Sequence, residues 1–172
     1  MGRKYAAFGV VGVLLFVLDQ LGKRHVASAV EVGERVPILG SLLAWTHLPA
    51  AGGALGLFRD WSASAALWGY GLLSSVVALV VFVFLRSLAP RDLGTAGALG
   101  AVLAGVLSNS FDRYRQGASI KFLHVGPAAS PLPDFNLADL AILLGVGTLI
   151  VELLATEMAA RAAERPRRPP PY

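Results

Sequence analysis

The sequence predicts an all-α membrane protein with four transmembrane helices and a small extracytoplasmic β-rich platform. Of the 172 residues, 55% are hydrophobic and only 15% are charged, whereas soluble domains carry roughly 25% charged residues. In addition, four apolar stretches approach the ~20 residues that a helix needs to cross a bilayer. We expect one membrane domain at residues 1–158 and a disordered, basic, proline-rich cytoplasmic tail at residues 159–172.

The first predicted span covers about residues 5–27. Its basic start, and small residues at 27–29 that could form a cleavage site, imitate a secretory signal. However, Asp19 and Lys23 lie between the apolar stretch and that site, where signal peptidases need a short neutral segment, so we expect an uncleaved helix. Because Asp19 and Lys23 are four residues apart, they can pair on one helix face.

The segment between the first two spans, residues 28–62, contains β-type residues interrupted by Gly and Pro. This pattern predicts a small strand-rich platform. The second span, at about residues 63–85, is the most uniformly apolar of the four.

The third span is expected at about residues 93–111 and the fourth at about residues 136–158. In the third, Gly97, Ala101 and Gly105 recur at every fourth position. Small residues at this spacing permit close contact between membrane helices, so a packing role is sufficient to explain them.

Positive charge gathers at the N-terminus, at the link between the second and third spans, and in the C-terminal tail. The residues at the first two places are Arg3, Lys4, Arg86 and Arg91. With four spans all three places fall on one side, and the positive-inside rule assigns that side to the cytoplasm. A basic tail beside a membrane span marks this side more often than it marks a nucleic-acid site, so we expect no nucleic-acid partner.

Two aspartates stand at the outer ends of predicted spans. Asp112 follows the third span in Asn109-Ser-Phe-Asp112-Arg113, and Asp139 heads the fourth span in Asn136-Leu-Ala-Asp139. A carboxylate at or just inside a bilayer surface is costly, and residues of this kind usually carry function. The two motifs therefore predict an aspartyl site at the membrane surface.

Four segments, taken in order along nearly the whole chain, resemble the prolipoprotein signal peptidases, also called signal peptidase II. They are Asp19-Gln-Leu-Gly-Lys23, Gly52-Gly-Ala-Leu-Gly-Leu-Phe58, Asn109-Ser-Phe-Asp112-Arg113 and Phe135-Asn136-Leu-Ala-Asp139. Each short string alone would be a weak signal, whereas the ordered set is fairly specific.

The resemblance implies an intramembrane aspartic endopeptidase that removes signal peptides from bacterial prolipoproteins just before a lipid-modified cysteine. It implies no metal and no other cofactor. The expected partners are a lipid-modified prolipoprotein, or a peptide inhibitor that mimics one, together with membrane lipid. The expected form is a monomer in the bacterial inner membrane, with both termini cytoplasmic.

The resemblance also implies two catalytic aspartates, of which Asp139 matches one. Its partner in the family lies nine residues after the aspartate that corresponds to Asp112, and that position is Lys121 in this chain. A second departure is Ala50, which stands where the family usually has an asparagine before the glycine matching Gly52.

Lysine at this position removes the chemistry that a carboxylate pair supplies. Two close carboxylates share one proton, so that one acts as base and the other polarises the scissile carbonyl. A charged lysine accepts no hydrogen bond. Near Asp139 it would form an ion pair of order 4 kcal/mol at ~4 Å and an effective dielectric near 20, before desolvation. We therefore expect impaired catalysis.

Three substitutes for the missing aspartate remain open. Asp112 is present, although its motif implies a structural role with Arg113. Asp134 lies close to Asp139 in the sequence. Ser119 and Lys121 would share a face of a strand, and a Ser–Lys pair is a known nucleophile–base arrangement.

The other motif residues have structural as well as functional interpretations. Asn109 and Asn136 either cap helices or orient the aspartates. Asp19 and Lys23 form a helix ion pair or contact a lipid headgroup. For the whole chain the alternatives are a non-catalytic paralogue that binds lipoprotein signal segments or a peptide inhibitor, and, more remotely, a small-molecule transporter.

Overall fold

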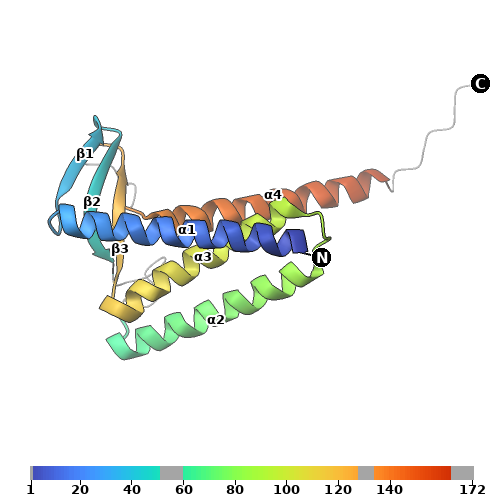
Figure 1. Ribbon diagram of the computed structural model, residues 1–172, viewed down its shortest axis with the longest axis horizontal. Helices are drawn as coiled ribbons and strands as arrows, with labels where there is room; N and C mark the ends of the chain where they lie inside the picture. The colour runs from blue at the N-terminus through green and yellow to red at the C-terminus, as the bar shows by residue number, and fades with distance from the viewer. Residues whose placement is uncertain (1, 51–59, 128–133, 164–172) are drawn as a thin grey trace, which may run out of the picture.

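The computed structural model describes residues 2–50, 60–127 and 134–163, and Figure 1 shows their arrangement. The elements follow the order α1 (Gly2–Ala29), β1 (Arg35–Leu39), β2 (Leu43–Ala50), α2 (Ala63–Ser87), α3 (Leu93–Gln116), β3 (Ser119–Val125) and α4 (Leu137–Ala163). Gly52 and residues 164–172 of the expected tail lie outside the described residues. α4 continues past residue 158 to Ala163.

All four predicted spans are confirmed as helices long and apolar enough to cross a membrane. α1 begins before its predicted apolar stretch, and its first turn contains a polar residue that has partners of its own. At the start of α1, the buried Lys4 donates from Nζ to the carbonyl oxygens of Arg86 at 3.0 Å and Leu88 at 2.5 Å. Lysine thus satisfies carbonyls at the end of α2, which have no partner within their own helix.

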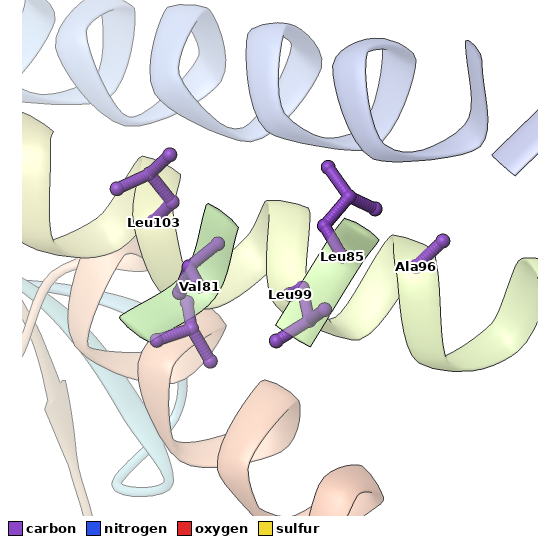
Figure 2. Packing of buried hydrophobic residues seen from close by; sticks show 6 residues of the cluster. Val81, Leu85, Ala96, Leu99 and Leu103 are labelled. Atoms are coloured by element: carbon purple, nitrogen blue, oxygen red, sulfur yellow. The ribbon is translucent and has the colours of Figure 1, made fainter. Parts of the chain in front are cut away.

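α3 is the central helix, with buried residues along most of its length. Figure 2 shows α2 packing on it, with Val81 and Leu85 against Ala96, Leu99 and Leu103. On its other faces α3 packs against α1 and α4.

Two glycines permit the close approach of these neighbouring helices. A Cβ added at Gly100 would lie 2.4 Å from the carbonyl oxygen of Phe8, and one at Gly105 would lie 2.4 Å from that of Ala138. The small-residue character of this span is therefore a packing feature, as the sequence predicts, but Gly100 rather than Gly97 makes the tightest contact with α1.

The platform is a three-stranded antiparallel sheet in the order β1-β2-β3. β1 and β2 come from the predicted strand-rich segment, and β3 comes from the loop after α3. In the register of β2 with β3, Leu48 is opposite Lys121 and Ala50 is opposite Ser119. Leu123 forms an isolated bridge with Phe135. The third strand therefore runs beside the chain that leads into α4.

A tight turn connects α3 to β3. Gly117 ends α3 in the left-handed conformation with φ 76°, and its N–H donates to the carbonyl of Arg113 at 2.9 Å. Glycine adopts this conformation without the steric cost that a Cβ brings. The turn places Ser119 and Lys121 beside the last turns of α3, at the same end of the molecule as the start of α4 (Figure 1).

Candidate site at the sheet-bearing end of the helix bundle

A buried ion-pair cluster joins α1 to α3. Lys23 Nζ lies 2.5 Å from Asp19 Oδ2 and 2.5 Å from Asp112 Oδ2, and all three residues are at most 4% exposed. The pairing of Lys23 with Asp19 follows the four-residue spacing, whereas the bridge to Asp112 depends on helix packing. Asp19 also accepts a hydrogen bond from the backbone N–H of Ala138 at 2.8 Å, so it stabilises the start of α4.

Asn109 lies at the centre of a hydrogen-bond network that connects α3, β3 and α4. Its Oδ1 accepts from Ser119 Oγ at 2.6 Å, Asn136 Nδ2 at 2.8 Å and Lys23 Nζ at 3.2 Å. Its Nδ2 donates to Asp139 Oδ1 at 3.0 Å. The one amide therefore links the buried cluster to the Asp139 carboxylate and orients that carboxylate.

Asn136 and Asp139 form a reciprocal cap at the start of α4. Asp139 N donates to Asn136 Oδ1 at 2.8 Å, and Asn136 N donates to Asp139 Oδ2 at 3.0 Å. This arrangement resembles a capping box, in which two N–H groups that lack helical partners are satisfied by two side chains. The capping role of Asn136 is thus present together with the orienting role.

Lys121 reaches Asp139 from β3. Lys121 Nζ lies 2.6 Å from Asp139 Oδ2, and the two side chains are 16% and 30% exposed. Burial lowers the pKa of Lys121 from its ordinary value of 10.5, and the Asp139 carboxylate opposes this shift only in part. The positive charges of Arg113 and Lys23 lower the pKa of Lys121 further.

The other two aspartates are held away from Asp139 by partners of their own. Asp112 accepts from Gln20 Nε2 at 2.8 Å and from Ser119 Oγ at 3.1 Å, in addition to its ion pair. Asp134 pairs with His124 Nδ1 at 2.7 Å and with Arg35 at 3.4 Å. Neither aspartate forms a carboxylate pair with Asp139 in these contacts.

The hydroxyl of Ser119 is directed to Asn109 and Asp112, and Ser119 is fully buried. Lys121 directs its ammonium to Asp139 instead. Although the two residues lie on one strand face, as their spacing predicts, the observed contacts do not assemble a Ser–Lys nucleophile. Arg113, which the motif predicted to support Asp112, stacks over the Tyr70 ring at 4.4 Å and donates to the Asn109 carbonyl at 3.0 Å.

Chemically, the site presents a single solvent-accessible carboxylate that receives three donors. Those donors are Lys121 Nζ, Asn109 Nδ2 and the N–H of Asn136. The arrangement can bind a polar group, but among the described residues the contacts of Asp139 include no second carboxylate that could share a proton with it.

The sequence analysis did not identify Gln20 and Ser108 as members of the network, and it did not predict the structural role of Ser119. Ser108 Oγ donates to Asp19 Oδ2 at 2.7 Å and accepts from Gln20 Nε2 at 2.9 Å. Two of these residues were within reach of the motif analysis, since Gln20 lies inside the first motif and Ser108 directly precedes Asn109.

The fold and the site define a class: a multi-pass membrane protein with a carboxylate site where its helices meet a small sheet. The family described as signal peptidase (SPase) II matches residues 11–155. This chain belongs to the signal peptidase II family.

Individual relatives agree with this assignment. The chain is 34% identical to a lipoprotein signal peptidase of Geobacter sulfurreducens over 158 residues, covering 91% of this chain and 97% of the relative. It is 31% identical to a lipoprotein signal peptidase of Pseudomonas aeruginosa (strain UCBPP-PA14) over 154 residues, covering 89% and 90%. A solved bacterial membrane enzyme has a TM-score of 0.77 at 21% identity, covering 94% of this chain and 93% of that one, which confirms the fold.

Proposed function

We propose that this protein binds lipid-modified prolipoprotein signal segments at its sheet-bearing end and cleaves them poorly or not at all. The observation that carries the proposal is the ion pair between Lys121 Nζ and Asp139 Oδ2 at 2.6 Å. It stands where the family resemblance implies a second catalytic carboxylate. Membership of the signal peptidase II family supports the binding half of the proposal, because the match spans most of the chain.

The loss of cleavage follows from the chemistry of the pair. Aspartic proteolysis needs an ionised carboxylate to activate water and a protonated carboxylate to polarise the scissile carbonyl. Lys121 supplies neither group, and its charge competes with the attacking water for Asp139 Oδ2. The remaining aspartates do not repair the site, because Asp112 and Asp134 are committed to Lys23 and His124.

Binding and cleavage can be measured separately on the same protein. We expect the purified chain in lipid nanodiscs to capture a fluorescent lipid-modified prolipoprotein peptide without releasing its signal segment. Competition by a peptide inhibitor would show that the inhibitor shares the site. Failure to bind the peptide would contradict the recognition half, and turnover that depends on Asp139 and on Lys121 would contradict the catalytic half.

We further propose that both termini are cytoplasmic and that the sheet faces away from the cytoplasm across the bacterial inner membrane. The basic residues at the chain ends and between α2 and α3 support this orientation. Because the sequence contains no cysteine, single cysteines at exposed Ser28 and Ser87 report the two sides cleanly. Labelling of Ser28→Cys only from the cytoplasmic side would contradict the orientation.

A further inference from the structure

A polar pocket opens between the ends of α1 and α3, beside the buried ion-pair cluster. Its volume is about 310 Å³, and its basic lining residues are Lys23, Arg24 and Arg115. Among the described residues that line it, the only acidic one is Asp112, which Lys23 already pairs with at 2.5 Å. Because Lys23 is shared by Asp112 and Asp19, the positive charge at the mouth of the pocket comes from Arg24 and Arg115.

The two arginines at this pocket are available to a ligand. Both are exposed. Within the part of the chain that the structure describes, neither forms an ion pair with an acidic residue, and the guanidinium of Arg115 lies 5.5 Å from the centroid of the Phe111 ring. Arginine is well suited to phosphate, because its planar guanidinium donates two parallel hydrogen bonds.

An apolar pocket of about 550 Å³ adjoins the polar one. It lies between α1, α2 and α3, and Phe111 belongs to both linings. Phe16 and Leu107 line its part nearer the middle of the bundle. These residues lie eight positions before Arg24 and Arg115 on their helices, a distance of about 12 Å at a rise of ~1.5 Å per residue.

Aromatic residues mark the level of the membrane surface at this place. Trp68 and Tyr114 line the apolar pocket and are 80% and 76% exposed. Tryptophan and tyrosine gather where the hydrocarbon meets the headgroups. The polar pocket therefore lies at headgroup level, and the apolar pocket extends from it toward the hydrocarbon.

We propose that the two pockets together bind one anionic phospholipid of the leaflet on the sheet side, with its phosphate at Arg24 and Arg115 and an acyl chain in the apolar pocket. This site is separate from the Lys121–Asp139 pair, which lies between β3 and α4. A lipid here would press α1 against α3 next to Lys23 and Asp112, and so stabilise the contact that closes the buried cluster.

Native mass spectrometry of the purified full chain in detergent tests this site. It measures the affinity of the first bound phosphatidylglycerol and of phosphatidylcholine with the same acyl chains. At ~1 kcal/mol per basic residue near an anionic headgroup, two arginines should favour phosphatidylglycerol by about 25-fold. The double variant Arg24→Gln/Arg115→Gln should lose this preference. The equal-charge control Arg86→Gln/Arg91→Gln, at the opposite end, should keep it.

A second variant pair tests the acyl-chain part. A Cβ added at Gly71, which lines the apolar pocket, meets no atom within 4 Å, so Gly71→Phe is the variant chosen to fill the pocket. Gly71→Phe should weaken the binding of both lipids. The control Gly147→Phe, on α4, should leave the binding of both lipids unchanged; a Cβ added there also meets no atom within 4 Å. Unchanged affinities in Gly71→Phe would overturn the proposal.

Three further results would also overturn it. The first is equal affinity of the wild-type chain for the two lipids. The second is an equal loss of preference in both arginine double variants, which would indicate a general charge effect. The third is displacement of phosphatidylglycerol by millimolar inorganic phosphate, which would indicate an anion site with no need for a lipid. None of these measurements depends on cleavage.

Discussion

Two lysine–carboxylate clusters lie at the same end of this molecule, and they differ in how completely they are closed. Lys23 is 2% exposed and is shared by two aspartates of α1 and α3. Lys121 is paired with one aspartate, and both side chains keep access to solvent. Asn109 connects the two clusters, since it accepts from Lys23 and donates to Asp139.

The difference separates a fully buried lysine–carboxylate cluster from a partly exposed lysine–carboxylate pair. In the buried cluster of Lys23, Asp19 and Asp112, removal of the lysine would leave the aspartates without a counter-charge, and an unpaired buried ion is strongly destabilising. In the partly exposed pair of Lys121 and Asp139, we expect that the lysine can be replaced at a smaller cost in stability. We therefore expect substitutions in the first cluster to affect the stability of the fold and substitutions in the second to affect mainly its chemistry.

The largest expected effect comes from breaking the closed cluster. Lys23→Met should destabilise the protein by about 3–5 kcal/mol, because it leaves Asp19 and Asp112 buried side by side without a counter-charge. Thermal unfolding in detergent measures the loss. A loss below 1 kcal/mol would show that the cluster does not hold α1 and α3 together.

A smaller effect is expected at the open pair. Lys121→Met should change the free energy of unfolding by no more than about 1 kcal/mol, because Asp139 keeps its two amide donors and its contact with solvent. The same unfolding assay compares the two methionine variants directly. Equal losses in both would remove the distinction between a structural and a replaceable lysine.

The smallest effect is a pH dependence. Because burial lowers the pKa of Lys121 below 10.5, the folded chain releases this proton at a lower pH than the unfolded chain does. Between the two values the unfolded chain binds more protons, so this group makes stability rise with pH. The free energy of unfolding of the wild type, relative to that of Lys121→Met, should therefore increase as the pH approaches 10.5. A shift in the opposite direction would contradict the burial of Lys121.

The features that the sequence predicted correctly are those that depend on local pattern. The length of the apolar stretches identified the four spans. The β-type residues interrupted by Gly and Pro indicated the segment that forms the first two strands. Motif spacing brought Lys121 to Asp139, because the turn at Gly117 and the strand that follows fix the distance from Asp112.

The features that the sequence did not predict depend on how the helices pack against one another. Nothing in the α1 sequence indicates that Asp19 accepts from the backbone of Ala138 on α4, 119 residues away. In the same way, the choice of Gly100 as the closest contact with α1 depends on the rotation of α3 about its own axis. Such contacts are properties of packing, and a pattern within one helix does not contain them.

We infer that Lys121 occupies the place of a second catalytic carboxylate. The most direct measurement is cleavage of a lipid-modified prolipoprotein by purified wild type, Lys121→Asp and the double variant Lys121→Asp/Asp139→Asn. We predict that the wild type has little or no cleavage activity and that Lys121→Asp gains activity. The gain should be partial, because Ala50 also departs from the family pattern, and the double variant should lose it. Robust wild-type turnover that survives Asp139→Asn would contradict the account.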